Sequence, residues 1–252
     1  MNPSTAPQTD KPIYFLLSGP PGAGKSTFGM LVAPLEVDRI IDYDKVRWNQ
    51  TQEFLKSFPS FSREQADAVA SGIATQTVNS QMLEATRQNK SFGVEGMIWQ
   101  DSSWDFATQM QKIGYDFHLT YMGLENATLS ERRVLQRIAE GGHTYVNGEV
   151  ARACYEKNLE ALNQHYHQPD RLELYDNSGQ QELFIACLQK GAVTKALTGK
   201  LPDWVCRKLP AIASRIEAFQ ATQQQQLSPT PPMAKPAPAT SQPAERRKGL
   251  RL

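Results

Sequence analysis

A glycine-rich stretch near the start of the sequence has the residue types and the spacing needed to bind phosphate. Residues 19–26, GPPGAGKS, match the pattern G-x-x-x-x-G-K-[S/T] at every fixed position. Gly22 and Gly24 let the backbone wrap closely and direct its N–H groups at phosphate oxygens. Lys25 supplies a cation for the β- and γ-phosphates, and the Ser26 hydroxyl supplies a ligand for Mg²⁺. This P-loop predicts a nucleoside-triphosphate site formed by Gly19, Pro20, Pro21, Gly22, Ala23, Gly24, Lys25, Ser26 and Thr27.

Acidic residues that follow other apolar runs indicate what reaction the nucleotide could serve. Asp44 ends the run 39–44, where it could act as a general base or metal ligand, or simply cap a turn or helix. Asp42 would share its side of a strand and could support Asp44 or be structural. Glu95 lies in a third apolar run, and a buried carboxylate is unfavourable unless it is paired or functional.

Arginines in the second half of the sequence could supply further positive charge. Arg133 and Arg137 are four positions apart and share one helix face, with Arg152 nearby in the sequence. Planar guanidinium groups suit a lid that closes on phosphates, although a solvated charged face is the plainer alternative. His143 follows two glycines on a loop, and its type and position assign it no role. Asp176, in Asp-Asn-Ser, could bound the nucleotide base or make an Asx turn.

The pattern of apolar runs predicts the elements that must position these residues. We expect strands at 13–17, 39–44, 91–96, 117–122 and 171–175, alternating with helices at 25–32, 62–88, 104–113, 127–140, 147–165 and 181–189. Such alternation predicts an α/β fold, a three-layer α/β/α P-loop NTPase of the nucleotide-kinase type with a parallel sheet. Ligands of such sheets bind beyond the carboxyl ends of the strands. The P-loop, Asp44, Glu95 and Asp176 all follow such ends, which predicts one active site.

The sequence divides into one domain and two flanking segments. Residues 1–11 are polar and are expected to be disordered, and residues 12–220 are expected to form the kinase-like domain. Within it, the core covers about 12–190, and 191–220 form a helical extension whose helix at 204–219 should be kinked or split by Pro210. Residues 221–252 are rich in Gln and Pro and predict a disordered tail. Its basic end, 245–252, either solubilises the protein or contacts an acidic partner.

Composition excludes several classes of protein. The 252 residues carry a formal net charge of +1, which gives no reason to expect nucleic-acid binding. No apolar run approaches the roughly 20 residues needed to span a bilayer, and the polar first residues lack a signal sequence. Cys154, Cys187 and Cys206 have no metal-binding spacing and are expected to be reduced thiols. We therefore expect a cytoplasmic enzyme.

Five motifs, in this order, resemble the zeta-toxin family of P-loop kinases, especially its free-standing "predicted ABC-type ATPase" branch. The resemblance covers about residues 12–190 and rests on 19–27, 41–47, 92–96, 131–143 and 174–179. It implies a kinase fold with ATP and Mg²⁺ as phosphoryl donor and UDP-N-acetylglucosamine as acceptor. The resemblance also implies a possible protein partner, a small antitoxin that would block the nucleotide site.

Family roles carry over to individual positions. Lys25 and Ser26 match the phosphate and Mg²⁺ residues, Asp44 the acid that activates the acceptor hydroxyl, Glu95 the acid of the sugar-nucleotide site, and Arg137 a lid arginine. Two places depart from the family pattern. Gly96-Met97 stand where many members have threonines, and Ala153-Cys154 replace an arginine pair, so that Arg152 either substitutes or a cation has been lost.

These observations lead to one leading hypothesis and two alternatives. The leading hypothesis is an ATP-dependent kinase of a small-molecule hydroxyl, with UDP-N-acetylglucosamine as first candidate. We expect the catalytic residues to be Asp44, Lys25, Arg137 and Arg152, the acceptor-binding residues Glu95 and Arg133, and a further nucleotide-binding residue Asp176. The alternatives are a kinase of another nucleotide, sugar or nucleic-acid acceptor, and an ATP-binding regulatory module without transfer activity.

Overall fold

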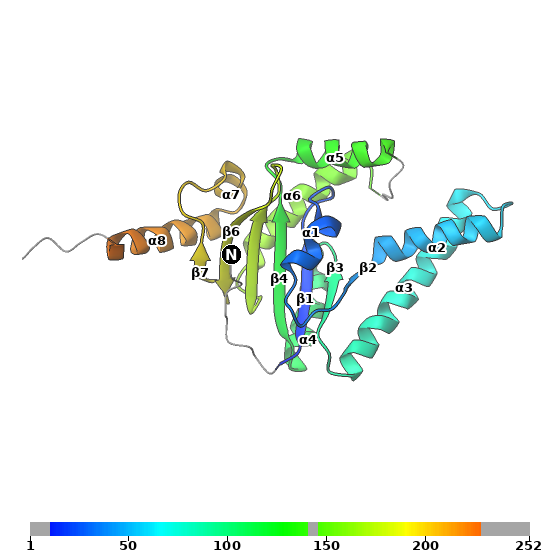
Figure 1. Ribbon diagram of the computed structural model, residues 1–252, viewed down its shortest axis with the longest axis horizontal. Helices are drawn as coiled ribbons and strands as arrows, with labels where there is room; N and C mark the ends of the chain where they lie inside the picture. Colours follow the sequence, from blue (N-terminus) through cyan, green and yellow to red (C-terminus); the bar gives the residue numbers. More distant parts are fainter. Residues whose placement is uncertain (1–10, 141–145, 228–252) are drawn as a thin grey trace, which may run out of the picture.

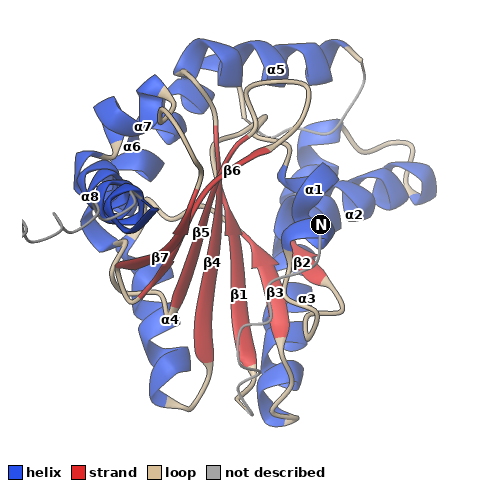
Figure 2. Cartoon of the chain, turned by 60° about the vertical axis from the view of Figure 1, so that its left-hand side comes forward, coloured by secondary structure: helices blue, strands red, loops and turns tan. Residues whose placement is uncertain are grey.

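Seven strands form one sheet in the computed structural model of the protein, which describes residues 11–140 and 146–227 (Figures 1 and 2). The order across the sheet is β2-β3-β1-β4-β5-β6-β7. Neighbouring strands are parallel from β2 to β5, whereas β6 and β7 are antiparallel to their neighbours. The strands are β1 Ile13–Ser18, β2 Ile40–Asp42, β3 Phe92–Glu95, β4 Asp116–Gly123, β5 Arg171–Asp176, β6 Leu183–Gln189 and β7 Ala192–Ala196.

Strand β1 is central because both of its edges are paired and both of its faces are covered. All six of its residues are buried, as expected for an inner strand of a parallel sheet. On one face Gly29 packs closely against Leu17. On the other face Tyr14 makes ring contacts with Phe117 of β4 and with Phe106. The predicted fold class is confirmed, with an antiparallel pair of strands added at one edge of the parallel sheet.

Eight helices in the described residues surround the sheet (Figure 2). Local sequence fixes where several begin: Ser62 and Gln65 form a reciprocal capping box, and the side chains of Asn126 and Asn147 cap two more helices. None of the described helices is long and apolar enough to cross a membrane. The helices are α1 Lys25–Val32, α2 Tyr43–Ser57, α3 Arg63–Arg87, α4 Asp101–Lys112, α5 Ala127–Ala139, α6 Gly148–His165, α7 Asp203–Lys208 and α8 Pro210–Leu227.

Strand register brings the expected site residues to one edge. Leu17 of β1 and Asp42 of β2 both pair with Glu95 at the end of β3. Gly123 pairs with Asp176 at the ends of β4 and β5. Both views show α5 lying across these carboxyl ends, and α2 and α3 extending as a hairpin from the β2 edge (Figures 1 and 2).

The helix expected at 181–189 is wrong, because these residues form strand β6. A short apolar run such as 184–188 fits a buried strand as well as a helix segment, and its antiparallel pairing with β5 decides the outcome. The extension at 191–220 was expected to be helical, yet it begins with strand β7. Lys190 and Gly191 have φ of 47° and 80°, which suit the tight turn of a β6–β7 hairpin.

Other element boundaries also differ from expectation, and two of them concern the site and the tail. The second strand ends at Asp42 rather than Asp44, because the Asp42 carboxylate accepts a hydrogen bond from the Lys45 N–H (3.0 Å) and starts α2. Pro210 splits the expected helix, as predicted, but α8 continues to Leu227, beyond position 221 where the tail was expected to begin. The expectations for residues 1–10, 141–143 and 228–252 lie outside the described residues.

Candidate functional site

The P-loop connects β1 to α1 through two glycines in left-handed conformations. Gly22 and Gly24 have φ of 75° and 83°, a region that residues with a Cβ rarely adopt. Gly24 is the N-cap of α1, so the positive end of this helix faces the same pocket as the loop. The local sequence thus produces the glycine-dependent turn and the helix start that its pattern predicts.

Three side chains meet at the base of the loop. The Lys25 Nζ donates to the carbonyl oxygens of Gly19 (3.0 Å) and Pro20 (3.2 Å), and lies 3.7 Å from Glu95 Oε1. The Ser26 hydroxyl donates to Glu95 Oε2 at 3.3 Å. Burial raises the pKa of Glu95; the nearby Lys25 ammonium opposes this shift, and Asp42 adds to it. Glu95 therefore lies against the two P-loop residues that are predicted to bind phosphate and Mg²⁺.

A pocket in front of the P-loop collects most of the predicted site residues. Lys25, Ser26, Asp44, Glu95 and Arg137 all line it, although they come from α1, α2, β3 and α5. The sequence predicts these five as site residues but not the apolar members of the lining, Val134 and Val146. Apolar residues on or near α5 carry no chemical signal in a sequence, and only the fold reveals that they face the pocket. The complete lining is Pro21, Gly22, Ala23, Gly24, Lys25, Ser26, Asp42, Asp44, Glu95, Met97, Val134, Arg137 and Val146.

Arg152 and Asp176 are not among the described residues that line this pocket. The Arg152 guanidinium pairs with Glu131 (Nε to Oε2, 2.6 Å), and its side chain is 50% exposed. The Asp176 carboxylate accepts a hydrogen bond from the Ser178 N–H (3.0 Å), which is the Asx turn considered as its alternative role.

Arg133 also lies outside the lining, behind the P-loop. Its guanidinium donates to the backbone carbonyls of Gly22 (3.3 Å), Asn177 (2.8 Å) and Ser178 (3.3 Å). Asn177, which sequence reasoning did not select as a site residue, contacts the loop as well. The only available signal was its place in the turn after β5.

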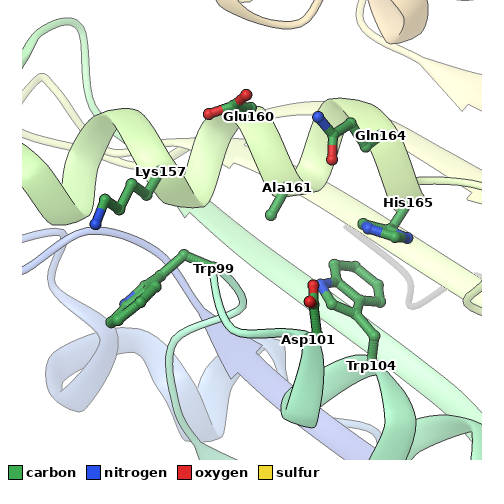
Figure 3. Close-up of a pocket in the computed structure, with 8 residues that line it drawn as sticks. All are labelled: Trp99, Asp101, Trp104, Lys157, Glu160, Ala161, Gln164 and His165. Atoms are coloured by element: carbon green, nitrogen blue, oxygen red, sulfur yellow. The ribbon is translucent and has the colours of Figure 1, made fainter.

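A larger cavity, of about 280 Å³, lies between the start of α4 and the C-terminal half of α6 (Figure 3). Trp99 and Trp104 lie on one side of it, and Lys157, Glu160 and His165 on the other (Figure 3). It adjoins the P-loop pocket through the segment 97–99, since the Trp99 indole N–H donates to the sulfur of Met97 (3.2 Å). None of the predicted site residues lines this cavity.

The donor set fits one magnesium ion of the kind that accompanies nucleoside triphosphates. Within the described ranges there is no cluster of three or more His, Cys, Asp or Glu side chains that could hold a metal by themselves. Mg²⁺ in nucleotide sites needs only one or two protein groups, since phosphates and water complete its octahedron. The Ser26 hydroxyl with the Glu95 carboxylate beside it meets that need.

Comparison with known structures supports the fold alone, because sequence identities are low. A structure described as the PezAT chromosomal toxin–antitoxin system of Streptococcus pneumoniae matches with a TM-score of 0.50 and 17% identity, covering 85% of this chain and 90% of that chain. The AvrRxo1-ORF1:AvrRxo1-ORF2 complex with ATP matches with a TM-score of 0.55 and 13% identity, covering 83% and 80%. The same complex with sulphate ions matches equally well, covering 84% and 80%.

Comparison of the sequence with family models identifies the family. No curated protein matches the chain. The family model described as "Zeta toxin" matches residues 2–187, which is well over half of the chain and includes every candidate site residue. The resemblance carried by the five motifs is thereby confirmed, and the chain belongs to the zeta toxin family.

Proposed function

We propose that the protein is an ATP-dependent phosphotransferase that phosphorylates a hydroxyl group of a small molecule, with UDP-N-acetylglucosamine as first candidate. The observation that carries this proposal is the meeting of a P-loop, Asp44, Glu95 and Arg137 in one pocket. Membership of the zeta toxin family supports it, and so does the fold shared with a complex solved with ATP. UDP-N-acetylglucosamine is proposed from the family resemblance.

The pocket residues have distinct roles in the proposed transfer. The acceptor oxygen attacks the γ-phosphorus, the bond from that phosphorus to the bridging oxygen breaks, and ADP leaves. Asp44 accepts the hydroxyl proton as general base. Lys25 and Arg137 stabilise the negative charge that spreads over the transferring group.

Glu95 has a role toward ATP, the phosphoryl donor, as well as toward the acceptor. Its contacts with Lys25 and Ser26 orient the cation and the hydroxyl of the P-loop. Ser26, with Glu95 close by, would hold Mg²⁺, which neutralises charge on the β- and γ-phosphate oxygens when bound. Arg152 is bound to Glu131 outside this pocket, so it has no part in the proposed transfer.

A second protein chain is the proposed regulatory partner. The PezAT structure is described as a toxin–antitoxin system, and AvrRxo1-ORF1 was solved together with ORF2. We propose a small antitoxin that covers the P-loop pocket of this protein, which would prevent nucleotide binding by occupying the same surface.

A binding module without transfer activity is the second candidate, and the position of Arg152 favours it. The family arginine pair is replaced by Ala153 and Cys154, and Arg152 is paired with Glu131 instead of lining the pocket. Loss of a cation at the transferring phosphate can reduce the rate by several orders of magnitude.

A transfer assay decides between these candidates. The protein is incubated with γ-labelled ATP and a panel of acceptors: UDP-N-acetylglucosamine, other nucleotide sugars, free sugars, nucleosides and a nucleic-acid 5′ end. The proposal expects label on UDP-N-acetylglucosamine, abolished by Lys25→Ala. Label on another member of the panel would replace the substrate, and tight ATP binding without transfer to any acceptor would select the binding module.

A further inference from the structure

Three consecutive carbonyl groups of the P-loop accept hydrogen bonds from side chains outside the loop. The Pro21 oxygen accepts from the Ser130 hydroxyl (2.7 Å), and the Gly22 oxygen accepts from Arg133 Nη1 (3.3 Å). The Ala23 oxygen accepts from the Asn177 side-chain amide (2.8 Å). Ser130 and Arg133 lie on α5, whereas Asn177 follows β5. Side chains from two separate segments therefore form hydrogen bonds with one short loop.

These bonds determine which way the loop N–H groups point. In a trans peptide unit the C=O and the following N–H point in opposite directions, and the described chain contains no cis peptide. Carbonyls held toward α5 and the β5–β6 turn therefore direct the N–H groups of Gly22 and Gly24 away from them. Both glycines line the P-loop pocket, where N–H groups can bind phosphate. The N–H of Ala23, between them, donates to the Pro20 oxygen and closes the turn.

Arg133 also connects α5 to the turn between β5 and β6. Besides the Gly22 oxygen, its guanidinium binds the carbonyls of Asn177 (2.8 Å) and Ser178 (3.3 Å). Asn177 is itself fixed, since its N–H donates to the Gly123 oxygen at the end of β4. The loop, α5 and the β5–β6 turn are thus tied by one planar side chain that has the several donors needed to reach three acceptors.

The P-loop glycines pack closely against the side chains of Arg133 and Asn177. A Cβ added at Gly22 would lie 2.9 Å from the Arg133 Cβ, and one added at Gly24 would lie 2.4 Å from the Asn177 amide nitrogen. Ser130 is fully buried and Asn177 nearly so. Glycine is therefore favoured at both positions for two reasons: a Cβ would clash with Arg133 or Asn177, and the φ angles are positive.

We propose that Arg133, together with Ser130 and Asn177, is a positioning device that holds the P-loop in its phosphate-binding conformation without contacting the nucleotide. This extends the proposed function, because it assumes that the P-loop pocket binds ATP. It replaces the acceptor-binding role expected for Arg133 from its place in the sequence. Without Arg133 the loop visits other conformations, and apparent ATP affinity falls in proportion to the competent fraction.

The test compares Arg133→Met with Arg132→Met, a matched control on the adjacent, exposed arginine of α5. ATP binding is measured by calorimetry, and backbone hydrogen exchange is measured for peptides covering residues 19–27. For Arg133→Met we expect about tenfold weaker ATP binding and faster exchange in this loop without ATP. At saturating ATP, kcat stays within about twofold of wild type, because binding selects the same competent loop. Arg133→Lys, with fewer donors, gives an intermediate loss, and Arg132→Met behaves as wild type.

Two results would overturn the proposal. Unchanged ATP affinity and unchanged exchange in Arg133→Met would show that the loop holds its own conformation. A large fall in kcat with unchanged ATP affinity would place Arg133 at the reacting groups. Should Arg133→Met fail to fold, Ser130→Ala decides in the same way, because it removes only the bond to the Pro21 oxygen. Absence of ATP binding by the wild type would contradict the proposed function. The hydrogen-exchange measurement would still show whether Arg133 holds the P-loop.

Discussion

The two sides of the P-loop pocket differ in how their groups are held. One side, called the donor side because it would bind the phosphoryl donor ATP, is the P-loop. Its residues Pro21, Gly22 and Ala23 are fixed through their backbone carbonyls by side chains of α5 and the β5–β6 turn. Elsewhere in the lining, on what we call the acceptor side, Asp44 comes from the first turn of α2 and Met97 from the segment before α4.

The α2–α3 hairpin that carries Asp44 is held together mainly by its own contacts. The Arg47 guanidinium pairs with Asp67 across the two helices, and the Thr51 hydroxyl also donates to Asp67 (3.1 Å). The rings of Phe54, Phe58 and Phe61 contact one another at its end. On the proposed function, phosphate recognition would depend largely on backbone geometry, whereas the general base Asp44 would be supplied by a separate hairpin.

The largest effect is expected from Lys25→Ala on the donor side. The variant loses the cation that is held by the Gly19 and Pro20 carbonyls and faces Glu95. We expect phosphoryl transfer to fall by about 10³-fold, in line with the loss of one charge-stabilising donor. The unfolding midpoint should change little, which circular dichroism checks. Retention of wild-type transfer would contradict the assignment of this pocket as the phosphate site.

Gly24→Ala tests whether the donor side depends on backbone conformation. An alanine there has an unfavourable φ of 83° and a Cβ within 2.4 Å of Asn177, and the left-handed conformation alone costs about 1 kcal/mol. We expect ATP affinity to fall about tenfold.

Gly72→Ala is the control for this substitution. Gly72 lies within α3 with open space around its Cβ position, so its replacement should stabilise the helix by about 0.5–1 kcal/mol. Its ATP affinity should equal that of wild type. Equal affinities for all three proteins would show that the loop tolerates a different conformation.

Glu95 lies between the two sides, and its protonation should be visible in stability. Burial raises its pKa in the folded protein, although the Lys25 ammonium acts in the opposite direction. Between the unfolded pKa, about 4.3, and the raised folded pKa, the folded state binds more protons than the unfolded state. The contribution of Glu95 to stability is therefore greatest below the unfolded pKa and falls as pH rises through the folded pKa.

Glu95→Gln removes this dependence. Chemical denaturation across this pH window should show the variant gaining stability relative to wild type as pH rises. Glu53→Gln, at an exposed position of α2, is the control and should follow wild type more closely. Parallel curves for wild type and Glu95→Gln would contradict the raised pKa.

The smallest effect on nucleotide binding is expected from the hairpin. Arg47→Met breaks the partly buried contact with Asp67 and should reduce the free energy of unfolding by about 1–3 kcal/mol. ATP affinity should stay at its wild-type value, because α2 and α3 do not hold the P-loop carbonyls. Lys208→Met, which breaks the exposed pair with Glu156, should cost about 0–1 kcal/mol. A weakened ATP affinity in Arg47→Met would show that the two sides are coupled.

Local features of the sequence predicted the fold class, and they selected residues that the fold brings to one pocket. The P-loop conformation, the helices that start near positions 62 and 147, and the split at Pro210 depend on neighbouring residues, so short patterns suffice. Strand β6 was mistaken for a helix because its apolar run has no distinguishing period, and only pairing with β5 decides its conformation.

Contacts between distant segments could not be predicted in the same way. Arg133 and Asn177 are 44 positions apart, and both are more than 100 positions from the loop they hold. Their side-chain types suit many roles, and helix spacing alone suggested a lid facing the substrate. The sequence suggests Arg152 because it lies near Arg133 and Arg137 along the chain, whereas the fold pairs it with Glu131.

The central claim is that Asp44, on the hairpin side, activates an acceptor for a phosphate held on the P-loop side. Asp44→Asn keeps the size of the side chain and removes its ability to accept a proton. ATP affinity and phosphoryl transfer to UDP-N-acetylglucosamine are measured on the same preparations of wild type and variant. We predict equal ATP affinity and at least about 10²-fold slower transfer by the variant. Equal transfer by both proteins would contradict the role of Asp44.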